Sequence, residues 1–175
     1  AVDVRTMGSR PSGIGMYIYN FLKELMNEDK FEIVLFTDVS ESEHIKFFID
    51  KGIKVRCFGE KVNVSAKVYR YFRFIRRELK SLKPDLFWEP NSVIPIKLSG
   101  DFKIMTTVHD TFPLDCEEYF GKVYKTYFKI GMKNTLRMAD KVVYNSNQSR
   151  KRTVELFDSA KDIDSYVSYI PIDSY

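Results

Sequence analysis

The chain has 175 residues, a length typical of one domain, and its 44% hydrophobic and 30% charged residues are those of an ordinary globular protein. Its net charge of +4 is too mild to indicate nucleic-acid binding, and no nucleic-acid-binding module is visible. No apolar stretch approaches the roughly 18 residues of a membrane span, and no signal peptide is apparent. Cys57 and Cys116 lack a Cys-x-x-Cys spacing, which favours free thiols in the cytoplasm.

Strand-like and helix-like segments alternate along the chain. Short apolar or β-branched runs predict strands at residues 1–5, 31–37, 53–58, 85–90, 103–110, 141–146 and 166–172. Apolar residues spaced by three and four, with Gly52 and Pro84 as stop signals, predict helices at residues 14–27, 41–51, 64–82, 117–138 and 147–158. This alternation predicts one doubly wound α/β domain, a Rossmann-like three-layer α/β/α arrangement around a mostly parallel sheet.

Two glycines lie between the first expected strand and the first expected helix. In an open parallel sheet, ligands bind beyond the carboxyl ends of the strands, so this loop is a candidate site. Backbone N–H groups around Gly13 and Gly15 could receive a phosphate or a sugar hydroxyl at the start of the helix. The spacing is not Gly-x-Gly-x-x-Gly and no P-loop lysine follows, so neither a dinucleotide site nor a P-loop is indicated. A tight turn without a ligand is the alternative interpretation.

Polar side chains also mark the ends of two later strands. His109 and Asp110 come at the end of the expected strand 103–110, which places them at the carboxyl edge of the sheet. Glu89 and Asn91 leave the preceding strand and form a polar patch next to His109 if the two strands are neighbours. A histidine satisfied by local hydrogen bonds and a solvated loop are the alternatives. The spacing of these residues does not fit a metal site, and no nucleophile elbow indicates a hydrolase.

The expected helix 64–82 is strongly basic on one face. An apolar stripe of Val64, Val68, Tyr71, Phe72, Ile75, Leu79 and Leu82 is expected to pack on the sheet. The opposite face carries Arg70, Arg73, Arg76, Arg77, Lys80 and Lys83, offset only by Glu78. This face is either a solvated surface or an attachment site for an anionic membrane leaflet, at about 1 kcal/mol for each basic residue near the lipid.

Six stretches together resemble the N-terminal domain of GT-B glycosyltransferases of family 4. In chain order they are SGIGMYIYNFLKEL, FEIVLFT, KPDLFWEPN, IPIK, KIMTTVHDTFPL and ADKVVYNSNQSRKRTVE, and the similarity runs from Ala1 to about Pro171. The resemblance implies retaining, metal-independent transfer of a sugar from a nucleotide-sugar donor, with no cofactor. It maps the glycine loop of the family onto Gly13 and Gly15, and the histidine that contacts the transferred sugar onto His109.

The family has two Rossmann-like domains that face each other across a cleft, the first mainly for the acceptor and the second for the nucleotide. The resemblance therefore implies that residues 1–171 form the acceptor-binding domain and that residues 172–175 begin the interdomain linker. The C-terminal nucleotide-sugar domain is then absent from this chain, so the chain alone is expected to be inactive.

The resulting hypothesis is a bacterial-type enzyme that acts on a polysaccharide or a lipid-linked acceptor, in the cytoplasm or at the inner membrane. His109 is the expected catalytic residue, and Gly13, Gly15, Glu89, Asn91 and Asp110 are the expected substrate-binding residues. The membrane-contact candidates are Arg70, Arg73, Arg76, Arg77 and Lys80. The alternatives are a non-catalytic flavodoxin-like module that binds a small molecule or nucleotide, and an interaction protein that docks through the basic helix.

Overall fold

The computed structural model describes residues 1–8, 10–39, 41–59, 64–94, 96–116 and 118–169, with the backbone alone for residues 64–66. Within these ranges the strands are β1 (Val2–Asp3), β2 (Val34–Thr37), β3 (Lys54–Cys57), β4 (Leu86–Glu89), β5 (Lys103–Val108), β6 (Lys141–Tyr144) and β7 (Asp164–Val167). The helices are α1 (Gly13–Leu25), α2 (Glu43–Asp50), α3 (Val64–Leu82), α4 (Phe112–Asp115), α5 (Lys122–Met138) and α6 (Asn147–Leu156), with short 3₁₀ turns η1 (Arg5–Met7) and η2 (Asp158–Ala160).

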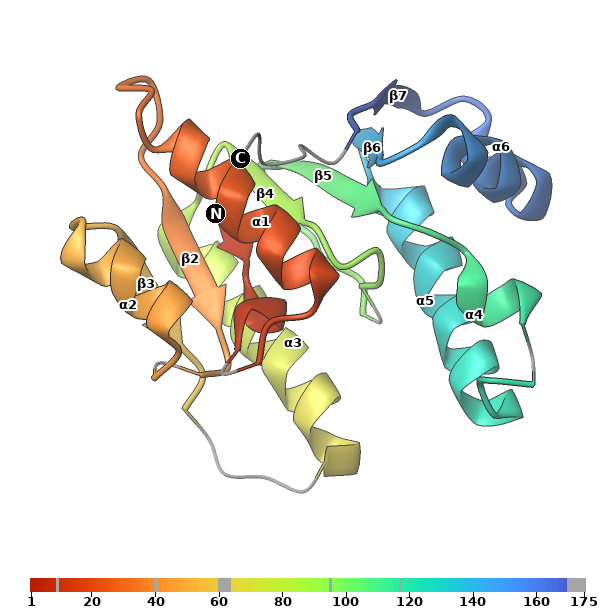
Figure 1. The fold of residues 1–175 in the computed structure, drawn as a ribbon, viewed down its shortest axis with the longest axis horizontal. Coiled ribbons are helices and arrows are strands. Elements are labelled where there is room, and N and C mark those ends of the chain that lie inside the picture. The colour runs from red at the N-terminus through yellow and green to blue at the C-terminus, as the bar shows by residue number, and fades with distance from the viewer. Residues whose placement is uncertain (9, 40, 60–63, 95, 117, 170–175) are drawn as a thin grey trace, which may run out of the picture.

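The seven strands form one sheet in the order β3-β2-β1-β4-β5-β6-β7, and every neighbouring pair is parallel. The chain builds outward from β1 to β3, then crosses back through α3 to place β4 on the other side of β1 (Figure 1). The predicted Rossmann-like α/β fold is therefore confirmed, with a sheet that is wholly parallel. The point where the strand order reverses lies between β1 and β4.

Both faces of the sheet are covered, as a parallel sheet requires. Successive residues of β2 show this directly: Leu35 packs in the core under α1 and α2, whereas Val34 and Phe36 pack in the core under α3. The two helix layers are visible on opposite sides of β2 and β4 in Figure 1. A third core lies under α5, where it joins β5 and β6. None of the helices described is long and apolar enough to cross a bilayer.

Several boundaries differ from the sequence-based expectation. The strand expected at 103–110 ends at Val108, so His109 and Asp110 lie in the following loop rather than in the strand. The helix expected at 117–138 begins only at Lys122, and the short helix α4 before it was not predicted. The strand expected at 166–172 is β7, which ends at Val167, and residues 170–175, including the expected linker, lie outside the described residues. Gly52 does follow the end of α2, with φ +83°, as its C-terminal glycine signal predicts.

The buried face of α3 is wider than the predicted stripe. Phe74, which the stripe omits, is 6% exposed and its ring centre lies 5.7 Å from that of Phe58. Val68, predicted to be buried, is 39% exposed, and Glu78 is buried at 8% rather than part of the basic surface. Burial of Glu78 is tolerated because Arg56 Nη1 approaches Glu78 Oε2 at 2.8 Å. Val64 lies outside the described side chains.

Candidate functional site

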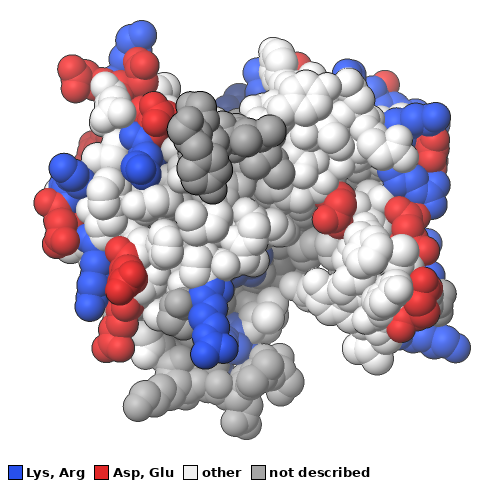
Figure 2. All heavy atoms as spheres, in the orientation of Figure 1, with Lys and Arg blue, Asp and Glu red and all other residues white. Residues whose placement is uncertain are grey.

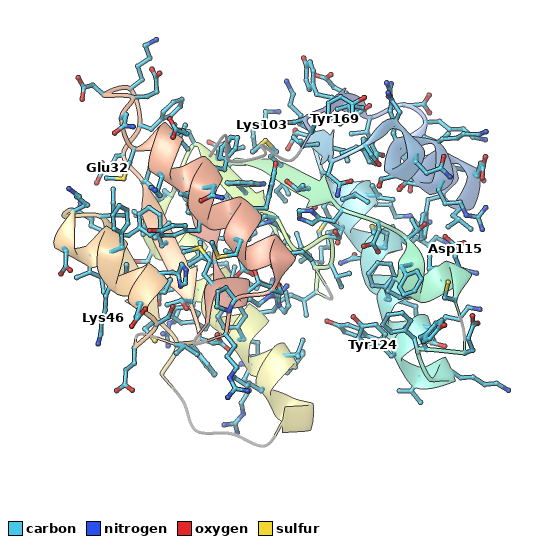
Figure 3. All side chains as sticks on the ribbon, viewed as in Figure 1. Glu32, Lys46, Lys103, Asp115, Tyr124 and Tyr169 are labelled. Carbon is cyan, nitrogen blue, oxygen red and sulfur yellow. The ribbon has the colours of Figure 1, made fainter. Side chains whose placement is uncertain are left out.

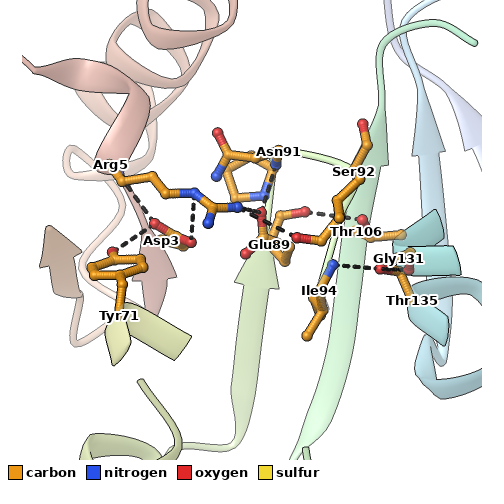
Figure 4. A network of polar contacts seen from close by, with 12 residues as sticks. Asp3, Arg5, Tyr71, Glu89, Asn91, Ser92, Ile94, Thr106, Gly131 and Thr135 are labelled. Atoms are coloured by element: carbon orange, nitrogen blue, oxygen red, sulfur yellow. Dashed lines mark hydrogen bonds and ion pairs between the residues drawn. The ribbon is translucent and has the colours of Figure 1, made fainter. Parts of the chain in front are cut away.

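The reversal of strand order between β1 and β4 brings two loops together at the carboxyl edge of the sheet. Open α/β sheets bind their ligands at this edge, where the strand order reverses. The end of β1 supplies Asp3 and, just beyond it, Arg5, while the end of β4 supplies Glu89 and Asn91. Figure 4 shows these side chains converging on one polar network.

Arg5 is the centre of this network. Its Nη2 atom donates at 3.4 Å to Glu89 Oε1 and at 3.4 Å to the carbonyl oxygen of Val93. Its Nε atom lies 3.4 Å from Asp3 Oδ2, and its Cζ atom lies 4.4 Å from the ring centre of Phe72. The side chain of Arg5 keeps 19% exposure, whereas both carboxylates have none. The Arg5 guanidinium group is therefore held by several partners, and only a small part of the side chain reaches the surface.

Asp3 accepts two hydrogen bonds within the network. Its Oδ1 atom accepts hydrogen bonds from the Tyr71 hydroxyl at 2.8 Å and from its neighbour's backbone, Arg5 N, at 3.1 Å. Burial, followed by the negative charge of Asp3, raises the pKa of Tyr71 well above its ordinary value, so the phenol stays a donor.

Glu89 is the neutral partner. Burial is the main reason that its pKa lies well above the ordinary value, and the charge of Asp3 adds to it, while Arg5 opposes both. Among the described residues, neither Glu89 Oε2 nor Asp3 Oδ2 has a hydrogen-bond partner. One cation faces two buried carboxyl groups, so one proton on Glu89 neutralises the network.

The loop after β4 is held rigidly beside this network. Asn91 N donates to Glu89 Oε1 at 2.9 Å, and the hydroxyl of Ser92, a buried residue with φ +68°, donates to the Thr107 carbonyl at 2.9 Å. Further along, Ile94 N donates to the Thr135 hydroxyl at 2.6 Å. Both polar atoms of the Asn91 side chain lack a hydrogen-bond partner among the described residues. The Asn91 amide is therefore a buried polar group beside Glu89.

His109 lies against the same loop, because β5 is the neighbour of β4. Its Nε2 atom is 3.0 Å from the Pro90 carbonyl oxygen, and its ring meets the Tyr17 ring edge-on with centres 5.1 Å apart. A carbonyl can only accept, so Nε2 carries the proton and Nδ1 is left as the acceptor nitrogen. Burial lowers the pKa of His109, although the Pro90 hydrogen bond and Asp110 oppose the shift. The ring is thus held neutral.

The remaining predicted residues are less centrally placed. Asp110 is exposed, and its Oδ1 atom accepts from Phe112 N at 3.0 Å, which closes the turn into α4. The hydroxyl of Ser149 donates to the His109 carbonyl at 2.6 Å, so the start of α6 also supports the histidine loop. Ser146 caps α6, accepting from Ser149 N at 3.0 Å, as its position predicts.

The glycine loop packs on the end of β1. A β-carbon on Gly15 would overlap the Thr6 carbonyl and lie 3.1 Å from Cβ of Pro11, so this position needs glycine for internal packing. Gly13 is exposed, and a β-carbon there would meet nothing within 4 Å. The structure thus supplies a packing reason for Gly15, and the approach of a substrate to Gly13 stays a prediction.

Sequence reasoning missed Asp3, Arg5 and Tyr71 as members of the site. The signal for Asp3 was a charged residue within the short apolar run AVDVR, since a strand buried on both faces rarely carries one unpaired. Tyr71 was assigned to the apolar stripe of its helix, and nothing local indicates that its hydroxyl reaches β1.

The predicted basic face lies on the outer side of α3. Arg70, Arg73, Arg76, Arg77 and Lys80 are all exposed. A shallow groove of about 370 Å³ between them is lined by Tyr69, Arg73, Arg76, Arg77, Lys80 and Ile96. Arg77 also pairs with Glu78 at 3.1 Å, so part of this charge is already compensated.

A second hollow of about 570 Å³ lies at the opposite, amino edge of the sheet. Its wall is largely apolar and includes Phe21, Leu25, Phe31, Leu86 and Trp88. None of the predicted site residues lines it. Among the described residues, no group of three or more His, Cys, Asp or Glu side chains is placed to hold a metal ion.

The fold and its site define a Rossmann-like domain with a largely buried polar network at the switch point of a parallel sheet. Residues 11–165 match the family model described as Glycosyltransferase Family 4, and because this match covers most of the chain, the chain belongs to that family. The crystal structure of Anabaena Alr3699/HepE in complex with UDP and glucose is similar in fold, with a TM-score of 0.59 and 12% sequence identity. The similarity covers 98% of this chain and 44% of that one. No curated protein sequence matches significantly.

Proposed function

We propose that this chain is the acceptor-binding domain of a retaining glycosyltransferase that transfers a sugar from a nucleotide-sugar to a polysaccharide or lipid-linked acceptor. The observation that carries the proposal is the contact of His109 with the Pro90 carbonyl, beside the Arg5–Glu89 pair at the switch point. Family membership supports sugar transfer. The nucleotide-sugar donor is supported by the UDP and glucose in the structure of HepE.

His109 acts on the transferring sugar in this proposal. Its neutral ring offers Nδ1 as an acceptor to a sugar hydroxyl, because Nε2 is occupied by Pro90. Positive charge develops at the reactive carbon of a glycosyl group in the transition state. A neutral imidazole holds the sugar without repelling the positive charge that develops at the reactive carbon. The contact between His109 and the sugar is therefore expected to be stronger in the transition state than in the ground state. Only contacts that strengthen in this way lower the barrier. Asn91, whose side-chain amide is buried and has no hydrogen-bond partner among the described residues, is the second group that would meet substrate hydroxyls if the loop after β4 opens.

The nucleotide is bound by a second domain, and no metal or cofactor takes part. Residues 1–171 are then the acceptor side, and the 175-residue chain alone binds donors weakly and is inactive. The enzyme works in the cytoplasm, and the exposed cations of α3 give it peripheral contact with an anionic inner membrane.

Calorimetry of the 175-residue chain with a panel of nucleotide-sugars tests the division between domains. We expect no binding stronger than about 1 mM, because the proposed nucleotide contacts lie elsewhere. Sub-millimolar affinity of the chain alone would overturn that division and favour a nucleotide-binding module. Donor hydrolysis by the complete enzyme, screened with the same panel, identifies the donor.

A further inference from the structure

The outer surface of α4 and the first half of α5 carries aromatic side chains in continuous contact. The aromatic row, as we call it, consists of Phe112, Tyr119, Phe120, Tyr124, Tyr127 and Phe128. Phe112 and Tyr119 are nearly parallel, at 25° with ring centres 5.9 Å apart. Phe120 and Tyr124 are likewise stacked, at 20° and 5.4 Å. Each ring therefore restricts the next.

The row is unusually exposed for large aromatic groups. Tyr119 is 74% exposed, and Phe112 and Tyr124 are each 46% exposed, while Phe128 at 7% anchors the row in the core. Rings on a surface that are held in fixed orientations lose little conformational freedom when a ligand packs on them. Contiguous exposed apolar surface of this kind marks a binding site more often than scattered single residues do.

The row begins and ends at the candidate site. Phe112 follows directly on the His109 loop, and its backbone N–H is bonded to Asp110. At the other end, burial raises the pKa of the Tyr127 hydroxyl, and the positive charge of Arg5 opposes that shift. In Figure 3 the Tyr124 side chain extends from α5 toward the hollow that Figure 2 shows between the two halves of this face. The aromatic row is therefore a continuous series of side chains that runs from the exposed surface toward the switch point.

The chemistry around the row selects its occupant. Two exposed carboxyl groups, those of Asp110 and Glu118, flank the row, and the third, that of Asp115, is paired with Arg152. With the exposed Lys122 and Lys129 of α5 close by in sequence, this segment carries charges of both signs and is not a basic surface of the kind that binds anionic lipid. Tyrosine hydroxyls in the row disfavour a purely apolar partner. A pyranose ring fits both features: its C–H face carries partial positive charge that the negative face of an aromatic ring attracts, and its hydroxyls donate to carboxylates.

We propose that the aromatic row is a subsite for the uncharged pyranose rings of a saccharide acceptor, which lie against Tyr124 and Tyr119 on the way to His109. This inference rests on the proposed function, and it names the acceptor as a glycan rather than a lipid headgroup alone. Polar contacts at the switch point would then fix the terminal sugar, while the row holds the preceding ones.

Binding of three uncharged probes, maltohexaose, cellohexaose and mannohexaose, to the 175-residue chain tests the subsite by calorimetry and NMR titration. At least one probe is expected to bind, and Tyr124→Ala to weaken it about tenfold, the loss typical of one aromatic contact. Tyr124→Phe retains the ring and should bind normally. Tyr166→Ala is the matched control, because Tyr166 on β7 is 54% exposed and lies outside the row. Each variant should unfold at the wild-type temperature.

The possible negative results distinguish failure of the subsite proposal from failure of the proposed function. If a probe binds and Tyr124→Ala does not weaken it, the saccharide lies elsewhere, so the inference falls while the proposed function stands. If none of the probes binds, the inference also falls, and the proposed function is judged by donor hydrolysis with His109→Ala. If Tyr124→Ala instead weakens sedimentation with vesicles of neutral or anionic phospholipid and leaves saccharide affinity unchanged, the row is a membrane contact and the inference is wrong.

Discussion

Arg5 Nη2 lies 3.4 Å from Glu89 Oε1, although Arg5 begins the η1 turn after β1, Glu89 ends β4 and the two are far apart in sequence. The pair links the turn after β1 to the end of β4, where the sheet reverses its strand order. Asp3 Oδ2 lies 3.4 Å from Arg5 Nε, so two buried carboxyl groups share one cation. The protonation of Glu89 is a consequence of this geometry, and it has a measurable effect on stability.

Glu89→Gln should make the chain more stable at neutral pH. The pKa of Glu89 is raised in the folded state above the ordinary 4.5, so the folded chain holds a proton that the unfolded chain releases. Stability contributed by that proton is complete below about pH 4.5 and is lost as pH rises toward the folded pKa. The advantage of Glu89→Gln, measured by urea unfolding, should therefore grow above pH 4.5 by at most about 1.4 kcal/mol per pH unit. An advantage that shrinks with rising pH would show that Glu89 is ionised.

Arg5→Met should have the opposite effect, because it removes the cation and leaves the two carboxyl groups. Breaking a buried pair in this way costs about 3–5 kcal/mol of unfolding free energy. The matched control is Arg152→Met, which breaks the more exposed pair with Asp115 and should cost much less, because solvent screens a surface pair. Equal losses for the two variants in urea unfolding would mean that the Arg5 network contributes no more than a surface pair.

The sheet and the loops at its carboxyl edge could be predicted because they depend on local patterns. Strand and helix periods are visible in short windows, and His109 and Asp110 directly follow β5 at the carboxyl edge of the sheet. The Arg5 network could not be predicted in the same way, because Tyr71 reaches it from α3 across the sheet. Phe74 was missed for a related reason: its burial depends on Phe58 and Phe36, which lie in other segments.

The two glycines of the first loop should respond differently to alanine. Gly15→Ala places a β-carbon on the Thr6 carbonyl, and such overpacking costs about 1–3 kcal/mol even after the gain in helix propensity. Gly13→Ala meets open space and should be neutral or slightly stabilising. Urea unfolding of both variants makes the comparison. A stable Gly15→Ala would show that the η1 turn can move away from α1.

Charge reversal on α3 tests membrane contact. With Arg73, Arg76 and Lys80 replaced by glutamate, binding to vesicles with acidic lipid should fall, as wild-type binding should with added salt, since salt screens the attraction. Reversal of the exposed Lys30, Lys46 and Lys51, which lie outside this helix, is the control for net charge. Vesicle sedimentation that depends on neither lipid charge nor salt would make the basic face an ordinary solvated surface.

His109→Ala should lower kcat of the complete enzyme by on the order of 100-fold, with a much smaller rise in the donor KM, since the contact is strongest in the transition state. The pKa of His109 is lowered from 6.5 by burial, so the neutral ring persists below the ordinary range. Its contribution to kcat should be constant above pH 6.5 and disappear only as pH falls through the lowered pKa, because protonation puts a positive charge beside the developing one. His44→Ala, which removes the other histidine, is the matched control and should leave both kcat and its pH profile unchanged. Near-normal turnover by His109→Ala, measured by donor hydrolysis, would reduce His109 to a structural support for Pro90.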